Sequence, residues 1–130
     1  MLNPNAQQWL YALRSGEYTQ GHNKLRTDDT FCCLGVACDL FAKANPTEGR
    51  WSGNEFVTAE NGNLCASLPR AVADWLGMKR VDGAPHLQTG YAKYGNASGQ
   101  NLVQDNDARR HTFDEISDII EAHQKELFNA

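Results

Sequence analysis

The chain has 130 residues, which is enough for one domain with a substantial core and too few for two ordinary domains. Hydrophobic residues make up 41% of the chain and charged residues 22%, so the composition excludes a wholly disordered protein. The net charge is −4 and the basic residues are scattered, which disfavours nucleic-acid binding because that needs clustered Lys and Arg.

The sequence contains no run of about 18 apolar residues that could form a membrane-spanning helix. Its first residues, Met1-Leu2-Asn3-Pro4, lack the basic start and apolar stretch of a secretory signal. We therefore expect a single domain over residues 1–130, with no membrane association and with its cysteines in a reducing cytoplasm.

The first predicted helix begins after Asn3, which can cap it, and carries Pro4 in its first turn. Gly16 ends this helix, since glycine tolerates the left-handed conformation found there. Its apolar side chains recur at three- and four-residue spacing, at Ala6, Trp9, Leu10 and Leu13. The polar stretch that follows, residues 18–26, is expected to hold a short turn or strand.

A second helix is predicted over residues 31–44, with cap candidates among residues 27–30. This segment is apolar nearly all round, so we expect the helix to be central and buried. Gly35 in its middle indicates close packing against another stretch of backbone. Asn45-Pro46 ends the helix.

The turn signals Gly53-Asn54 and Asn61-Gly62 predict a short β-hairpin around residues 51–58 and Leu64. A third helix starts at Pro69 and ends at Gly77, whereas residues 78–111 carry little helical pattern. Thr112 to Glu115 is a capping box that opens a last helix ending near Phe128. The predicted fold is an α-rich α+β domain of about four helices around the 31–44 helix, with a short hairpin.

Four cysteines, at positions 32, 33, 38 and 65, offer several chemistries. Adjacent Cys32-Cys33 lacks the ligand spacing of a zinc knuckle, so we expect no metal site and no cofactor. These cysteines are expected to be small buried side chains. The alternative is a nucleophilic Cys32 or Cys33 at a helix N-terminus, where the helix dipole favours the thiolate. Such a nucleophile needs a His base, and the spacing does not select one among His22, His86, His111 and His123.

Most of a second set of candidates lies within residues 78–111, which contain four glycines. The carboxylates of Asp105-Asn106-Asp107 could bind a cation or act as acid and base, or the segment could shape a turn before the last helix. Trp51 could anchor a partner or lie in the core. The remaining candidate binding residues are Tyr91, Tyr94, Arg109 and Arg110.

The order of the motifs resembles a family of small proteins common in tailed-phage genomes and prophages. The resemblance lies in Trp9-x-x-Ala12-Leu13-Arg14-Ser15-Gly16-x-Tyr18-x-Gln20, Phe31-Cys32-Cys33-Leu34-Gly35-Val36-x-Cys38-Asp39, Leu68-Pro69 with Trp75-Leu76-Gly77, and Asn106-Asp107 before Phe113-x-x-Ile116-x-x-Ile119-Ile120-Glu121. One departure is Asp105, where the pattern has an apolar residue. The resemblance implies a phage setting and a shared fold, and it implies no particular reaction.

Size, acidity, the lack of common catalytic signatures and this resemblance favour a non-enzymatic phage accessory protein. We expect it to bind and modulate a host bacterial protein in the host cytoplasm, for example a defence component. Two alternatives stay open: a thiol-dependent hydrolase or transferase using Cys32 or Cys33, and a protein that sequesters a small nucleotide ligand. The sequence does not determine the oligomeric state. Cys32, Asn106 and Asp107 could also converge in one site.

Overall fold

The computed structural model describes residues 2–22, 24–59, 62–64, 68–78, 112–122, 124 and 128. Its elements, in chain order, are α1 (Pro4–Ser15), β1 (Thr19–Gln20), β2 (Arg26–Thr27), β3 (Thr30–Phe31), α2 (Cys33–Ala44), β4 (Gly49–Ser52), β5 (Glu55–Thr58), β6 (Gly62–Leu64), α3 (Arg70–Leu76) and α5 (Phe113–Ala122). These four described helices and two small sheets confirm the predicted α-rich α+β class.

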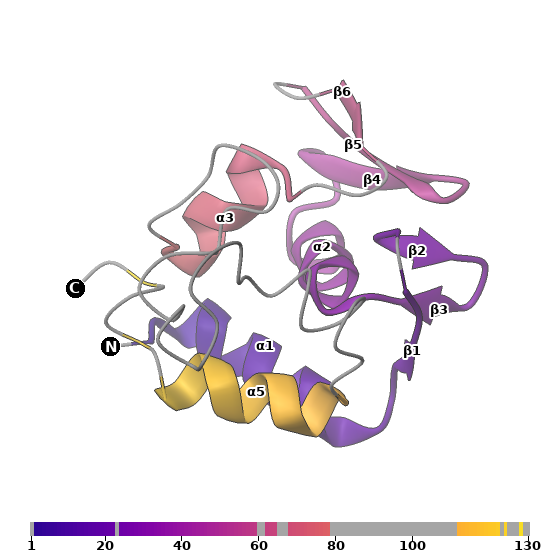
Figure 1. Cartoon of the computed structure of the whole chain (residues 1–130). Helices are drawn as coiled ribbons and strands as arrows, with labels where there is room; N and C mark the ends of the chain where they lie inside the picture. Colours follow the sequence, from indigo (N-terminus) through magenta and orange to yellow (C-terminus); the bar gives the residue numbers. More distant parts are fainter. Residues whose placement is uncertain are drawn as a thin grey trace, which may run out of the picture.

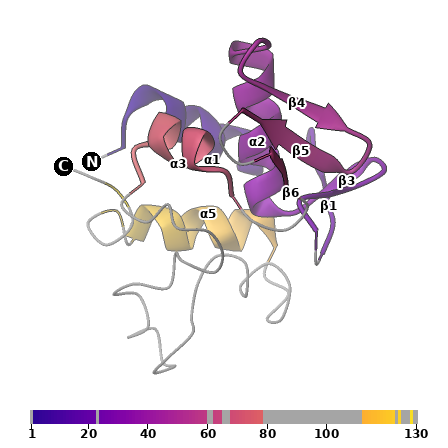
Figure 2. The same cartoon turned by 90° about the horizontal axis from the view of Figure 1, so that it is seen from above.

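Helix α2 occupies the centre of the fold, as its apolar composition predicts. Figure 1 shows α1 and α5 below it and the β4–β6 sheet above it. In the perpendicular view of Figure 2, α1 and α3 lie on one side of α2 and the strands lie on the other. The side chains from Cys33 to Cys38 are all buried, so α2 contributes to the core on nearly every face.

Each of the two sheets has three strands. In the first sheet β3 is central, paired in parallel with β1 and antiparallel with β2. In the second sheet β5 pairs antiparallel with both β4 and β6, with Phe56 opposite Trp51 and Leu64. The predicted hairpin and the strand expected within residues 18–26 are therefore confirmed, and β6 extends the hairpin to a third strand.

Helix α2 starts two residues later than the sequence predicts, and its cap is not among residues 27–30. Thr30 and Phe31 form β3, because their backbones pair with strands on both sides. The helix begins at Cys33, and the cap is Cys32, whose Sγ accepts a hydrogen bond from the Gly35 backbone N at 3.4 Å. The true cap is thus a buried thiol and not one of the polar residues 27–30.

Gly35 makes the close backbone approach that its position in the helix predicts. The Leu25 carbonyl lies directly against it, and a Cβ at position 35 would be 2.7 Å from the Leu25 carbonyl carbon. The same carbonyl oxygen accepts a hydrogen bond from the Cys32 backbone N at 3.1 Å. The segment before β2 is therefore fixed on the first turn of α2, and only glycine fits at that contact.

The ends of the outer helices follow the predicted local chemistry. Asn3 Oδ1 accepts from the Ala6 backbone N at 2.8 Å, and Gly16 ends α1 at φ +80°. Thr112 and Glu115 form both bonds of the capping box, at 2.8 and 3.1 Å. Gly77 ends α3 in the left-handed conformation at φ +78°. The predicted extension of the last helix to Phe128 passes through residues outside the described part of the chain.

Candidate functional site

The cysteines on and before α2 lie in the core. Cys32 is 6% exposed, and Cys33 and Cys38 are fully buried. Burial raises the pKa of Cys38 well above its ordinary value, and the nearby Cys32 and Asp39 add to that effect. The Cys33 carbonyl accepts the indole N–H of buried Trp9 at 3.0 Å. This environment is that of packed side chains, with little or none of the Cys32 and Cys33 surface exposed to solvent.

Asp39, in the middle of α2, is the centre of a polar network between the two sheets. Its Oδ2 accepts from the Tyr18 hydroxyl at 2.6 Å and lies 3.1 Å from the Lys43 ammonium. Its Oδ1 accepts from the indole N–H of Trp51 at 3.0 Å. One largely buried carboxylate therefore connects α2 to β4 and to the segment that leads into β1.

The network shifts the pKa values of its members in opposite directions. Burial alone would raise the pKa of Asp39, but hydrogen bonds from Tyr18, Lys43 and Trp51 and the charge of Lys43 lower it below its ordinary value. Burial, followed by the hydrogen bond to Asp39, raises the pKa of Tyr18 to about 12. Asp39 is therefore ionised and Tyr18 neutral at pH 7, so neither group is suited to proton transfer near neutrality.

Trp51, one of the predicted binding residues, is half-buried beside this network. The Arg26 guanidinium lies over its ring, 5.3 Å from the centroid, and also over the ring of Phe31 at 5.4 Å. The rings of Phe31 and Phe56 approach Trp51 edge-on, with centroids at 5.9 and 4.9 Å. With its N–H bonded to Asp39, Trp51 is an internal anchor between the sheets, and neighbours of this chain cover its ring in part.

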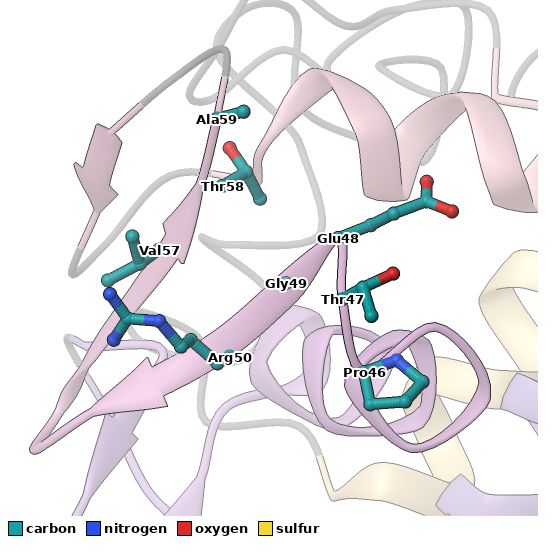
Figure 3. Close-up of a pocket in the computed structure, with 8 residues that line it drawn as sticks. All are labelled: Pro46, Thr47, Glu48, Gly49, Arg50, Val57, Thr58 and Ala59. Atoms are coloured by element: carbon teal, nitrogen blue, oxygen red, sulfur yellow. The ribbon is translucent and has the colours of Figure 1, made fainter.

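A small hollow of about 230 Å³ lies at the start of the second sheet, lined by residues 46–50 and 57–59. Figure 3 shows that its charged side chains do not converge, because Arg50 extends beside Val57 and Glu48 extends away on the other side. Ligand sites combine a concave surface with polar groups aimed at a common point. This hollow lacks that arrangement.

A larger hollow, of about 460 Å³, lies beside α1 and α5, which pack side by side (Figure 1). Leu2, Gln7, Leu10, Tyr11 and Arg14 line one side, and Glu121 and Gln124 line the other. We call this feature the α1–α5 groove. Tyr11 is 72% exposed, and among the described residues it is the one large hydrophobic side chain that is mostly in solvent. The groove is therefore the candidate contact site that combines the larger of these two hollows with an exposed aromatic side chain.

Most of the predicted site residues lie outside the described residues. These are Cys65, His86, Tyr91, Tyr94, Asp105, Asn106, Asp107, Arg109, Arg110, His111 and His123. The convergence of Cys32 with Asn106 and Asp107 therefore stays a prediction. Among the residues that the structure describes, no three His, Cys, Asp or Glu side chains are grouped so that they could hold a metal ion.

The sequence interpretation missed two features for which a signal was available. Tyr11 is a large aromatic residue off the apolar stripe of α1, and such a residue on a polar helix face indicates a possible contact surface. Asp39 is the one carboxylate within the apolar 31–44 segment, and a charge in such a segment needs buried partners. The charge of Asp39 does not by itself identify the side chains that bind it, because Tyr18 and Trp51 come from other elements of the fold.

Comparison with known proteins identifies the family of the chain. No curated protein and no solved structure shows significant similarity to the chain. Within the described ranges, no helix combines the length and apolar composition needed to cross a bilayer. A family model described as a domain of unknown function, DUF8296, matches residues 1–124. Since that model spans nearly the whole sequence, the chain belongs to the DUF8296 family.

Proposed function

We propose that this protein is a non-enzymatic phage accessory protein that binds a host bacterial protein in the host cytoplasm and modulates its activity. The phage setting is supported by the order of the sequence motifs, and the binding role is supported by the α1–α5 groove. The observation that carries the proposal is the exposure of Tyr11 at the edge of this groove.

An exposed tyrosine beside a concave surface is typical of protein contact sites. Tyr is enriched at the energetic centres of protein interfaces because it combines a large apolar ring with a hydroxyl. Leu10 lines the bottom of the groove and belongs to the core, so the surface around Tyr11 is packed directly on the core. A partner that covers Tyr11 removes apolar area from water without rearranging the fold.

The thiol-enzyme alternative has less support. An activated cysteine needs access to its substrate and a charged neighbour that favours the thiolate. Cys33 is fully buried and Cys32 is 6% exposed. No cysteine lines the hollow at residues 46–50 and 57–59 or the α1–α5 groove.

Site-specific photocrosslinking in the host tests the proposed function. A photoreactive phenylalanine analogue replaces Tyr11 in one version of the protein and Thr47, which is exposed on the loop after α2, in a second version. We expect one host protein to crosslink from position 11 and not from position 47. The purified partner should then bind the wild-type chain and lose binding to Tyr11→Ala. If position 11 yields no host protein, or the same set as position 47, the proposed function is wrong.

A further inference from the structure

The lining of the α1–α5 groove indicates what kind of segment can occupy it. Gln7, Leu10/Tyr11 and Arg14 follow one another at three- and four-residue spacing, so they form a stripe along α1. Seven residues of helix rise about 10 Å, which is two turns. A groove of this length beside two helices suits a short amphipathic helix, as in other helix-in-groove interfaces.

Arg14 connects the two walls at one end of the groove. Its Nη2 lies 2.9 Å from Asp118 Oδ1 and 2.8 Å from Glu121 Oε1. The three side chains are exposed to 37%, 75% and 55%, respectively. Exposed ion pairs contribute only about 0–1 kcal/mol to stability. This triad therefore adds little to the free energy of unfolding, although it places charged groups at one end of the groove.

The charge of the triad is negative, because one guanidinium faces two carboxylates. Arg14 uses one oxygen of each carboxylate, and within the described part of the chain Asp118 Oδ2 and Glu121 Oε2 accept no hydrogen bond. Asp114, one turn earlier on α5, is also exposed. A carboxylate with an open oxygen accepts strong charge-assisted hydrogen bonds from Lys or Arg.

We infer that the α1–α5 groove binds a basic amphipathic helix of the partner protein. One large apolar side chain of that helix packs on the exposed ring of Tyr11, above the buried Leu10. A Lys or Arg three or four residues away, one turn along the helix, pairs with the open oxygens of Asp118 and Glu121. This inference rests on the proposed function, and it names the chemistry of the partner segment.

Selection from a random peptide library tests the inference without knowledge of the host partner. A messenger-RNA display library of 16-residue peptides, a length of about four helical turns, is selected on the full-length chain, with removal of peptides that also bind Tyr11→Ala. We expect the selected peptides to carry a large apolar residue and a Lys or Arg three or four positions apart. Their binding is then measured by fluorescence anisotropy at low and high salt.

Three variants separate the contributions to binding. Tyr11→Ala should weaken binding of the selected peptides about tenfold or more, as loss of an interface anchor does. Asp118→Asn/Glu121→Gln should weaken it about three- to tenfold and reduce its salt dependence. Glu48→Gln/Asp74→Asn is the matched control, since it removes the same charge from exposed positions outside the groove and should change binding less than twofold.

The inference is overturned if no peptide distinguishes the wild-type chain from Tyr11→Ala. It is also overturned if the selected peptides are acidic or neutral, or if both double variants have the same effect. These outcomes differ from failure of the proposed function. Basic peptides that bind at the groove, together with crosslinking that finds no host protein, would retain the chemistry of the groove and reject the host-binding role.

Discussion

Replacement of Asp39 by Asn tests whether the polar network holds the two sheets against α2. The carboxylate accepts hydrogen bonds from Trp51 and Tyr18 and pairs with exposed Lys43. An amide of the same shape can still accept from the Trp51 N–H and can donate to the Tyr18 oxygen, so the loss is mainly that of the charge. Since a hydrogen bond to a charged group contributes about 1.5–3 kcal/mol, we expect Asp39→Asn to reduce the free energy of unfolding by about 2 kcal/mol. Asp39→Ala, which leaves the indole N–H without an acceptor, should reduce it by about 3–4 kcal/mol.

The stability difference between the wild-type protein and Asp39→Asn should depend on pH. The pKa of Asp39 is lowered in the folded state, so its stabilising contribution is present above its ordinary pKa of 3.8 and is lost as the pH falls through the lowered value. Urea unfolding followed by circular dichroism should therefore show the largest difference between the wild-type protein and Asp39→Asn at neutral pH. The difference should shrink in acid.

Tyr18 supplies a second readout from the same variant. Its pKa is raised from 10.0 to about 12, so its contribution to stability is complete below pH 10 and is lost as the pH rises through about 12. In Asp39→Asn the burial remains, while the negative charge and the hydrogen bond that Tyr18 donates to the carboxylate are gone, so the pKa of Tyr18 should fall toward 10.0. Ultraviolet titration of the phenolate, with Tyr18→Phe to identify its signal, measures this shift.

Asp74→Asn changes an exposed carboxylate on α3 and should alter the free energy of unfolding by less than about 0.5 kcal/mol. If Asp39→Asn behaves like Asp74→Asn, or if the pKa of Tyr18 is the same in the variant as in the wild-type protein, the network does not hold the sheets in the way described.

Other variants test the packing. Gly35→Ala should destabilise the protein by at least about 2 kcal/mol in urea unfolding, because the new Cβ meets the Leu25 carbonyl; a more stable variant would contradict that contact. Thr112→Ala should cost about 1 kcal/mol through loss of its capping hydroxyl, while an unchanged midpoint would show that the cap is unimportant. In a Cys65→Ser background the three remaining thiols are buried and should react with a disulfide reagent only as fast as the protein unfolds. Rapid labelling of the folded chain would revive the thiol-enzyme alternative.

The local features of this fold could be predicted from the sequence, whereas the non-local ones could not. Asn3 and Thr112 act as caps through neighbours three residues away, so their role can be inferred from sequence spacing. The start of α2 could not be inferred in this way. Thr30 and Phe31 are in a strand because β1, eleven residues earlier, pairs with them.

The candidate site likewise combines features that can be predicted from the sequence with features that cannot. A contact surface on the last helix can be suspected from its acidic side chains. The α1–α5 groove, however, depends on the packing of the first and last helices, as the Arg14–Glu121 pair shows across 107 positions of the chain. The Asp39 network likewise depends on residues 21 positions before and 12 positions after it. Such contacts follow from the tertiary fold.

The packing of α5 against α1 also determines when this protein can fold during its synthesis. Helix α1 leaves the ribosome before α5, but its buried residues, such as Trp9 and Leu13, share one core with Ile116 and Ile120 of α5. At about 5–20 residues per second, several seconds pass before α5 is made. Until then the apolar face of α1 has no α5 to cover it, so the nascent chain stays open to chaperones and proteases. The core around α1 is therefore complete only when α5 is present, and a chain that terminates before residue 113 should be degraded or aggregate.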